Sequence, residues 1–364
     1  MSKAVKVGVL GCYRGFHVVR EGFKVLGKEG VTVRALCDLD NERVKEAEKW
    51  FVENGCTDIL LFNDYKEMLK SDIEAIFIAT DAPLHVEHAI MALEAGKHVL
   101  CEIPTIYSKE EAVMLKEAVN RHPELKFMVA ENCCYAAFID TWKKMYEDGK
   151  LGIPVYAESE YLHCETTEKE VKPPKDPKYW RNNLPGSRYL THNLGPILYV
   201  LDDEVETVSC MVPDQDSKTL SGYYTEKKVA VILCKTKKGA VIRILICFGA
   251  YVGFDHNFAI YGTHGMLETD KSTDFDHKRC FARFSDLPFS KDKKIVVPLG
   301  FNPTENDVGH NGMDGVMFKD FIDCVANDKK PKLDVDYGIR ISMPGISAEE
   351  SYKNGFIPVK VPKF

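Results

Sequence analysis

The chain has 364 residues, a hydrophobic content of 45%, a charged content of 28% and a net charge of −7. This length exceeds what one hydrophobic core usually holds, so it predicts two domains. The sequence has no basic stripe, no apolar run near the roughly 20 residues that span a bilayer, and no signal-peptide pattern at its start. We therefore expect a cytoplasmic protein that binds neither nucleic acid nor membrane.

The 12 cysteines are scattered and form no Cys-x-x-Cys pair. Several of them lie in apolar runs, which is typical of buried, reduced thiols. Cys133 and Cys134 are adjacent, and neighbouring residues of a strand point to opposite faces. We therefore expect no metal site.

The first 130 residues alternate short apolar runs with helical patterns, as in a parallel sheet covered on both faces. In Leu84–Ala95 the apolar residues recur on one helical face, and Gly96 follows as a C-terminal cap. Repeated βα units predict a doubly wound Rossmann domain over residues 1–132. The predicted strands are Val5–Leu10, Val31–Cys37, Ala75–Ala79, Val99–Cys101 and Phe127–Ala130.

The pattern changes after a helix near Ala136–Asp148, where longer apolar segments follow one another with few helices between them. These segments predict an α+β domain over residues 133–364 with an open, mostly antiparallel sheet. Two helices close the chain, Gly315–Ala326 and one near Tyr337–Tyr352 that Pro344 should kink or break. The predicted strands are Val155–Leu162, Val205–Val212, Val229–Thr236, Val241–Phe248 and Phe258–Tyr261.

The turn after the first strand carries Gly11, Tyr13, Arg14 and Gly15. A tight turn here directs the N-terminus of a helix at a pyrophosphate, although the usual Gly-x-Gly-x-x-Gly spacing is only partly kept. The alternative is a tight strand–helix turn without a ligand. We take these four residues as contacts of a dinucleotide.

Asp38 ends the second strand, where its carboxylate can accept hydrogen bonds from both ribose hydroxyls and would repel a 2′-phosphate. This favours NAD over NADP as the cofactor; the alternative is that Asp38 caps the helix starting near Asn41. Thr80 follows the predicted strand Ala75–Ala79 at the same edge of the sheet. We assign Thr80 and His85 to the cofactor site as well, with a structural role as the alternative for His85.

Several motifs together resemble the Gfo/Idh/MocA family of sugar oxidoreductases, which join a Rossmann domain to an open-sheet substrate domain. The resemblance covers essentially the whole chain. The motifs are Ala79–Thr80, His85 with Ala89 and Ala92, Ala95–Val99, Glu102–Pro104, Tyr261–Gly265 and Pro344–Ile346.

Within that family, the chain is more similar to glycoside hydrolase family 109 than to the common dehydrogenases. Ile103 stands in Glu-x-Pro where those dehydrogenases have a lysine, and an isoleucine can donate no proton. Their Asp-x-Gly-x-His pattern is replaced by His192 and Pro196. The motifs shared with family 109 are Glu131–Tyr135, Glu160–His163, Trp180–Arg181, Tyr189–Pro196 and Gly309–Asp314.

This resemblance implies an NAD-dependent glycosidase in which the sugar is oxidised at C3, loses its aglycone by elimination, adds water and is reduced again. It places His192 beside the nicotinamide, where an imidazole suits proton transfer from the C3 hydroxyl. Tyr135 and Tyr189 are our choices for proton transfer at C2, and Tyr189 shares a face with His192 if the segment is helical. His163 is assigned to the substrate; packing or capping roles are the alternatives for all four.

The remaining assignments complete the predicted site. Glu102 and Glu131 each end a strand near the cofactor, with a local backbone hydrogen bond as the alternative. Trp180 could stack on a sugar ring and Arg181 could anchor the substrate, with a simple lid-packing role as the alternative. Both lie within a long connection from Cys164 to Arg188, a length that is typical of a functional or a disordered segment. His310 matches the family 109 pattern and is assigned to substrate binding.

Two rival functions remain open. One is an NAD-dependent sugar C3 dehydrogenase that releases a keto-sugar, and the other is a non-catalytic NAD-binding sensor, suggested by Ile103 and the disturbed glycine pattern. In each case the expected small-molecule partner is NAD, joined by a carbohydrate or glycoside for the enzymes. The exposed face of the open sheet favours a homo-oligomer.

Overall fold

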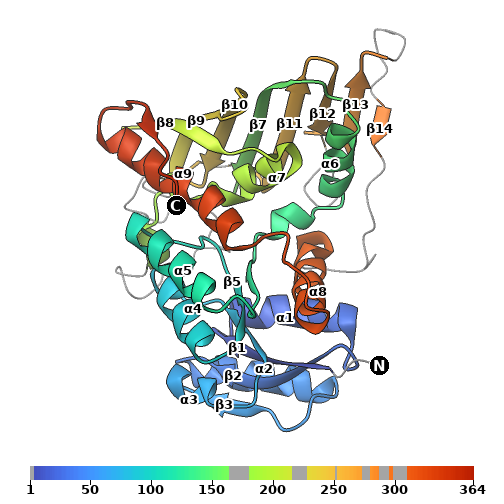
Figure 1. Ribbon diagram of the computed structural model, residues 1–364, viewed down its shortest axis with the longest axis vertical. Helices are drawn as coiled ribbons and strands as arrows, with labels where there is room; N and C mark the ends of the chain where they lie inside the picture. Colours follow the sequence, from blue (N-terminus) through green and yellow to red (C-terminus); the bar gives the residue numbers. More distant parts are fainter. Residues whose placement is uncertain are drawn as a thin grey trace. The chain divides into compact units, whose positions relative to one another are not determined.

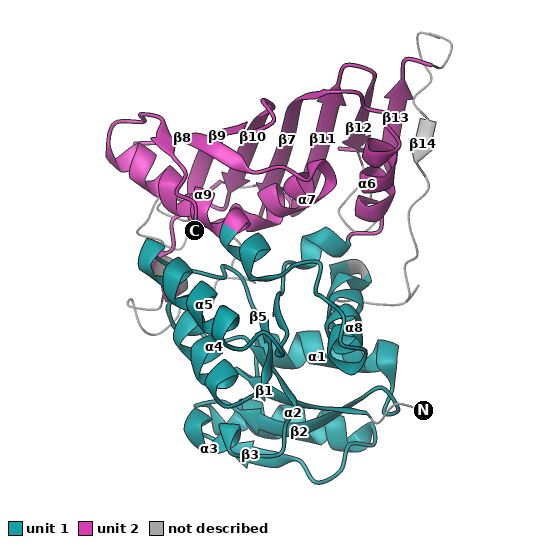
Figure 2. Ribbon diagram, viewed as in Figure 1, with its two compact units in different colours: residues 1–135, 302–339, 364 teal, residues 136–301, 340–363 magenta. Residues whose placement is uncertain are grey.

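A computed structural model describes residues 4–163, 180–214, 228–250, 252–272, 279–286, 295–297 and 310–364, with the backbone alone at 181, 182, 295–297 and 311. Contacts divide the chain into two compact units (Figure 2). Unit 1 comprises residues 1–135, 302–339 and 364, and unit 2 comprises residues 136–301 and 340–363. The predicted domain boundary after residue 132 stays a prediction. The sequence did not predict that residues 302–339 belong to unit 1.

Unit 1 is built on a parallel sheet of six strands in the order β3-β2-β1-β4-β5-β6. Figure 1 labels β1, β2, β3 and β5 of this sheet. All four residues of β4 are buried, as expected for a strand covered on both faces. The predicted doubly wound α/β fold is confirmed. The strands are β1 Val5–Leu10, β2 Val31–Cys37, β3 Leu60–Phe62, β4 Ala75–Ile78, β5 His98–Cys101 and β6 Phe127–Val129.

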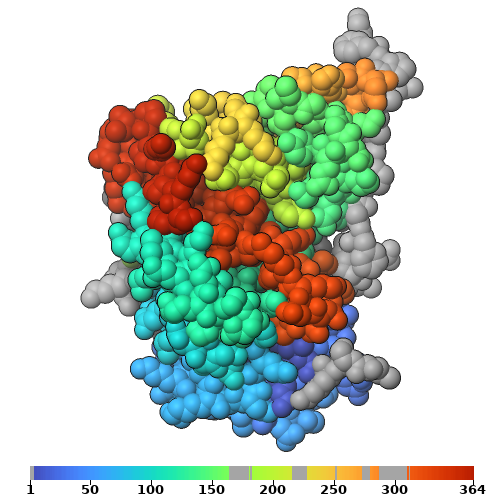
Figure 3. Space-filling view, viewed as in Figure 1, coloured from blue at the N-terminus to red at the C-terminus, as the bar shows by residue number. Residues whose placement is uncertain are grey.

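Helices join these strands, and one further helix of unit 1 comes from the C-terminal part of the chain. α4 and α5 lie at the surface, where their green-teal atoms are visible in Figure 3. The helices are α1 Arg14–Leu26, α2 Asn41–Glu53, α3 Tyr65–Leu69, α4 His85–Glu94, α5 Lys109–Arg121 and α8 Met313–Ala326, with short 3₁₀ turns η1 Ala82–Leu84, η2 Asn132–Tyr135 and η6 His310–Gly312.

Helix α8 packs closely on α1. A Cβ atom at Gly22 of α1 would lie 2.1 Å from the ring of Phe318 on α8, so this close approach requires a glycine. The packing brings the start of α8 to the edge of the sheet where β1, β5 and β6 end, which is the edge that binds ligands in doubly wound folds.

Unit 2 contains a nine-stranded sheet in the order β14-β13-β12-β11-β7-β10-β9-β8-β15. β7 and β10 pair in parallel, and the other described pairs are antiparallel. The predicted α+β domain with a mostly antiparallel sheet is therefore confirmed. The strands are β7 Pro154–Leu162, β8 Val205–Met211, β9 Val229–Thr236, β10 Val241–Cys247, β11 Asp255–Gly262, β12 Gly265–Thr269, β13 Cys280–Phe284, β14 Ile295–Val297 and β15 Val359–Lys360.

The described helices of unit 2 are α6 Ile139–Glu147, α7 Thr191–Leu201 and the larger part of α9 Val335–Lys353, with 3₁₀ turns η3 Trp180–Asn183 and η4 Gly186–Tyr189. α9 continues through Pro344, so the predicted break does not occur there. Ile341, Met343 and Ala348 are buried on both sides of the proline, and their packing holds the helix together. Across the described ranges, each helix is too short or too polar to span a bilayer.

Candidate functional site

The turn after β1 has a conformation that only glycine adopts easily. Gly11 has φ +91°, and a Cβ atom there would lie 2.4 Å from the carbonyl oxygen of Ala79. Helix α1 follows with no side-chain hydrogen bond at its N-cap, Tyr13, and no acidic residue in its first turn. The positive end of α1 is thus suited to an anionic ligand such as a pyrophosphate.

Asp38 is held rigidly beside this turn. Its Oδ2 accepts a hydrogen bond of 2.7 Å from the backbone N–H of Cys12, and its Oδ1 accepts one of 2.9 Å from Asp40. Helix α2 is capped by Asp40, which accepts from the N–H of Glu42, so Asp38 is not the helix cap. The carboxylate is therefore available to ribose hydroxyls, and its charge opposes a 2′-phosphate.

A pocket of about 820 Å³ opens at this edge of unit 1. Among the predicted cofactor residues, Gly11, Tyr13, Asp38 and Thr80 line it, whereas Arg14, Gly15, His85, Glu102 and Glu131 do not. The guanidinium of Arg43 lies 5.3 Å from the centre of the Tyr13 ring. The glycine turn, the fixed carboxylate and the size of the pocket fit the adenosine part of a dinucleotide.

Arg14 lies at the first turn of α1, but its guanidinium is bound by carboxylates of its own unit. Its Nε donates to Glu102 at 2.7 Å, and its two terminal nitrogens donate to both oxygens of Asp314 at 2.7 and 2.9 Å. Asp314 also accepts from Asn132 and lies 2.9 Å from Nδ1 of His310. The predicted contact of Arg14 with the cofactor stays a prediction.

The carboxylate of Asp314 is almost fully buried, at 1% exposure. Burial alone would raise its pKa, but the charge of Arg14 and the hydrogen bonds from His310 and Arg14 outweigh burial and hold the pKa well below the usual range. Asp314 therefore keeps its negative charge, which holds the guanidinium of Arg14 in place. This network joins the start of α8 to residues following β5 and β6.

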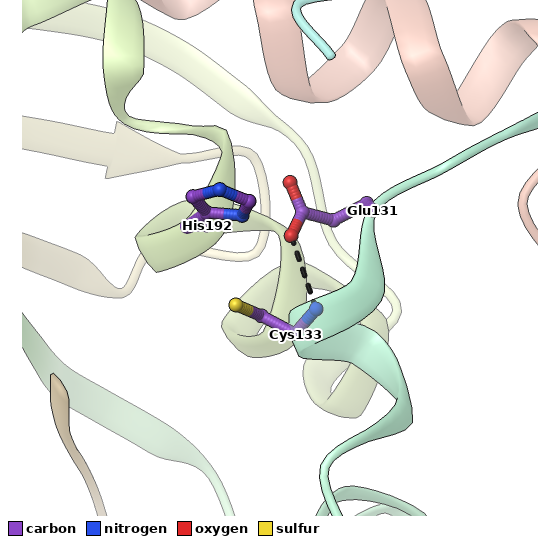
Figure 4. Close-up of side chains that lie close together, drawn as sticks. All are labelled: Glu131, Cys133 and His192. Carbon is purple, nitrogen blue, oxygen red and sulfur yellow. Dashed lines mark hydrogen bonds between the residues drawn. The ribbon is translucent and has the colours of Figure 1, made fainter. Parts of the chain in front are cut away.

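Glu102 and Glu131 both make the local backbone hydrogen bonds that the sequence left as alternatives. Glu102 accepts from the N–H of Ile103 at 3.0 Å, and Glu131 accepts from the N–H of Cys133 at 3.2 Å (Figure 4). Glu102 also binds Arg14, so its carboxylate positions another side chain. Their roles toward a cofactor stay predictions.

Tyr135 donates its hydroxyl hydrogen to Asp320 at 2.6 Å, and the ammonium of Lys332 lies 4.0 Å from the centre of its ring. Burial and the neighbouring Asp320 carboxylate raise the pKa of this phenol well above its usual value. Forming a phenolate at Tyr135 is therefore unfavourable. Its predicted part in catalysis stays a prediction.

Unit 2 gathers three of the predicted catalytic residues around one ring, that of Tyr161. The ring centre of Tyr161 lies 5.6 Å from that of His192, 5.7 Å from Tyr189 and 6.0 Å from His163. Tyr189 and His192 lie 5.2 Å apart, as their spacing in the sequence predicts. We call Tyr161, His163, Tyr189 and His192 the ring cluster.

Sequence reasoning did not select Tyr161. Its signal was the alternation of β7, which places Ser159, Tyr161 and the following His163 on the same face of the sheet. Further rings complete the surroundings of Tyr161: His256 lies 4.9 Å away and Phe248 5.6 Å away. The cluster therefore combines groups that can transfer protons with apolar ring faces that can pack on a sugar.

The predicted substrate residues are only partly described. Trp180 is half-buried at the start of η3, while the side chain of Arg181 and residues 164–179 lie outside the described part of the chain. His310 is exposed in η6, with Nδ1 directed at Asp314. Their contacts with a substrate stay predictions.

Two protein-family models match this chain. Residues 5–131 match the model described as the oxidoreductase family, NAD-binding Rossmann fold, of GFO/IDH/MocA proteins. Residues 139–268 match the GFO/IDH/MocA C-terminal domain.

Curated relatives match over nearly the full length. A glycosyl hydrolase family 109 protein of Solibacter usitatus (strain Ellin6076) is 28% identical over 404 aligned positions, covering 99% of this chain and 88% of the relative. A protein of the same description from Porphyromonas gingivalis is 26% identical, covering 100% of this chain and 85% of the relative.

Solved structures share the fold. An oxidoreductase domain protein from Kribbella flavida has a TM-score of 0.84 at 20% identity, and a levoglucosan dehydrogenase in complex with NADH and L-sorbose has 0.84 at 19%. Each comparison covers 100% of both chains. At these identities the likeness establishes the architecture.

Proposed function

Because the chain belongs to the Gfo/Idh/MocA family of oxidoreductases, we propose that it acts on a sugar as an NAD-dependent glycosidase, cleaving a glycoside with no net oxidation. It is an NAD-dependent enzyme, and NAD is the cofactor of its Rossmann domain. The nearly full-length similarity to proteins named as family 109 glycosyl hydrolases supports glycoside cleavage as the reaction.

The ring cluster of unit 2 is the observation that carries this proposal. Glycoside cleavage of this type needs one group to take a proton from the C3 hydroxyl and another to take the proton from C2. The cluster offers two phenols and two imidazoles within ring distances of 5.2 to 6.0 Å. A lysine after Glu102 is not available for this work, because that position is Ile103.

His192 takes the proton of the C3 hydroxyl in this proposal. Neutral imidazole accepts a proton near physiological pH and returns it readily, as a reversible step requires. Bound NAD supplies a reversible hydride acceptor for the sugar. His163, beside Tyr161, holds a sugar hydroxyl.

Tyr161 or Tyr189 handles the proton at C2. Both phenols lie against His192, with ring centres 5.6 and 5.2 Å from it, so either one can exchange protons with the same substrate face as the imidazole. The apolar faces of the same rings suit the C–H face of a sugar, and Phe248 extends that surface at 5.1 Å from Tyr189.

The test follows protons, aglycone and NADH together. The NAD-loaded protein is incubated in D₂O with a panel of α- and β-nitrophenyl glycosides. We expect release of nitrophenol, deuterium at C2 of the released sugar, and no accumulation of NADH. NADH formed in proportion to sugar consumed would instead identify a dehydrogenase that releases a keto-sugar.

His192→Ala should abolish both cleavage and deuterium exchange. The matched control is His264→Ala, since His264 is an exposed histidine of unit 2 in the turn between β11 and β12, outside the ring cluster. This control should keep wild-type rates. Equal activity in His192→Ala and wild-type protein would refute the assignment of His192.

A further inference from the structure

A buried histidine outside the ring cluster has unusual partners. His85 is the first residue of α4 and is 1% exposed. Its Nδ1 lies 3.0 Å from the carbonyl oxygen of Pro104, which follows β5, and its Nε2 lies 2.9 Å from the carbonyl oxygen of Thr80, which follows β4. One imidazole thus spans two loops at the cofactor edge of unit 1.

Both partners of His85 can only accept hydrogen bonds. A neutral imidazole has one N–H donor and one bare nitrogen, whereas an imidazolium has two donors. A neutral ring in this position, where His85 is 1% exposed, would set the lone pair of one nitrogen against a carbonyl oxygen. The protonated ring satisfies both carbonyls with charge-assisted hydrogen bonds.

His88, one turn further along α4, provides a comparison. Its Nδ1 lies 3.0 Å from the hydroxyl oxygen of Thr80. A hydroxyl can donate as well as accept, so a neutral ring suffices there. Burial lowers the pKa of His88, Glu87 raises it to a lesser extent, and the nearby His85 lowers it further.

We propose that His85 is held as an imidazolium that ties the Thr80 turn to the Pro104 loop, and that this tie positions the wall of the NAD pocket. Thr80 lines the pocket, and Pro104 closes the Glu102–Pro104 segment whose carboxylate holds Arg14. His85 is therefore a positioning residue for the cofactor that acts through two backbone carbonyls. The inference deepens the proposed function, since it rests on NAD binding to unit 1.

The surroundings of His85 set the cost of its charge. β4 carries no titratable residue. The titratable residues of the other elements around α4 are His98 and Cys101 of β5 with Glu102 following, Asp81 before η1, and Lys109, Glu110 and Glu111 in the first turn of α5. Burial and the positive end of α4 both disfavour a cation. The two hydrogen bonds to the carbonyl oxygens must outweigh both of these unfavourable effects. The imidazole ring should therefore lose its charge when either carbonyl moves away.

The decisive measurement is the protonation of each ring nitrogen. Protein labelled with ¹⁵N in histidine is studied by long-range ¹H–¹⁵N correlation at about pH 7.5. The His85 signals are assigned as those missing from the spectrum of His85→Gln. If that variant does not fold, the signals are assigned by through-bond correlation to the backbone. We expect both nitrogens of His85 to carry hydrogen while His88 has one bare nitrogen. A bare nitrogen at His85, whether from a neutral tautomer or a turned ring, would overturn the proposal.

NAD titration supplies the functional readout. The glutamine of His85→Gln carries its N–H donors on one nitrogen, whereas the ring donates from nitrogens on opposite sides. We therefore expect the affinity for NAD to fall about tenfold, which is the scale of one charge-assisted hydrogen bond. His264→Gln is the matched control.

Unchanged NAD affinity in a folded His85→Gln protein would contradict the positioning role. Neither measurement requires glycoside turnover. A protein that binds NAD but cleaves no glycoside would thus refute the proposed function and leave this inference standing.

Discussion

Tyr135 differs from Tyr161 and Tyr189 in its suitability for proton transfer. Tyr135 donates to Asp320 and its pKa is raised by burial, whereas Tyr161 and Tyr189 lie against His192. We predict that Tyr135→Phe keeps deuterium exchange at C2, and that Tyr161→Phe or Tyr189→Phe lowers it by about 10²-fold or more, the usual contribution of a general base. Exchange measured by mass spectrometry decides this, and loss of exchange in folded Tyr135→Phe alone would restore the assignment made from sequence.

Asp314 gives a pH-dependent contribution to stability. Its folded-state pKa is lowered below the unfolded value of about 3.9, so the stabilisation is present above that pH and is lost as the pH falls. Asp314→Asn should lower the free energy of unfolding at neutral pH by about 2 kcal/mol, because Arg14 loses its bidentate partner.

Urea denaturation from pH 7 down to about pH 3 tests this contribution. The difference between wild-type and Asp314→Asn protein should shrink on acidification. Asp72→Asn is the control, since Asp72 pairs with Lys6 and Arg34 at the surface, where solvent screens the charges. A difference that is constant with pH would exclude an ionic origin.

The local sequence pattern was sufficient to predict the position of some of these residues and insufficient to predict the partners of others. Gly11 and Asp38 could be placed from sequence because a strand, a tight turn and a helix follow one another within a few residues. The partners of Arg14 could not, because Asp314 lies 300 positions away and no local signal joins them. Tyr135 shows the same limit, since Asp320 lies 185 positions away.

At the scale of elements, the contact of α1 with α8 yields a stability prediction. Gly22→Ala would place a Cβ atom 2.1 Å from the ring of Phe318, so the helices must separate. We expect a loss of about 1–3 kcal/mol, as for other overpacked cores. Thermal and urea unfolding measure it, and the same substitution in a Phe318→Ala background should cost less; an equal cost in both backgrounds would place the strain elsewhere.

The long elements were predictable because each has a full hydrophobic period. β2 and β9 have the predicted ends, and α8 differs from its prediction by two residues at its start. β3, with three residues, and β15, with two, were not predicted, because so short a run has no periodicity of its own. The unbroken α9 departs from local preference because tertiary packing outweighs the missing N–H of Pro344.

At the scale of the whole molecule, the alternation of helices and strands specified the two fold classes but not the chain's return to unit 1. β7 and β10 pair in parallel although about 80 residues separate them. Hairpin signals predict only the pairing of strands that follow one another in the chain, so they could not predict this pair. The same sheet has an exposed face with large apolar side chains. Met211 of β8, Val231 and Leu233 of β9 and Val241 of β10 are 40 to 62% exposed.

This exposed sheet face leads to the prediction of a homo-oligomer. Apolar side chains on neighbouring strands form one surface, and Arg243 bridges Glu158 and Glu160 beside them, so the face carries both signs of charge and can pair with a copy of itself. Wild-type protein at micromolar concentration should have a mass in light scattering of at least twice 41.2 kDa.

Leu233→Glu should reduce that mass to one chain without loss of secondary structure, because it places a charge at the centre of the apolar strip. Val113→Glu is the matched control, since Val113 is exposed to a similar extent, 43% against 49%, but lies on α5 of unit 1. The control should keep the wild-type mass. A monomeric wild-type protein, or dissociation by Val113→Glu alone, would show that the sheet face is not the contact, since the prediction requires its apolar strip to exclude water between two copies.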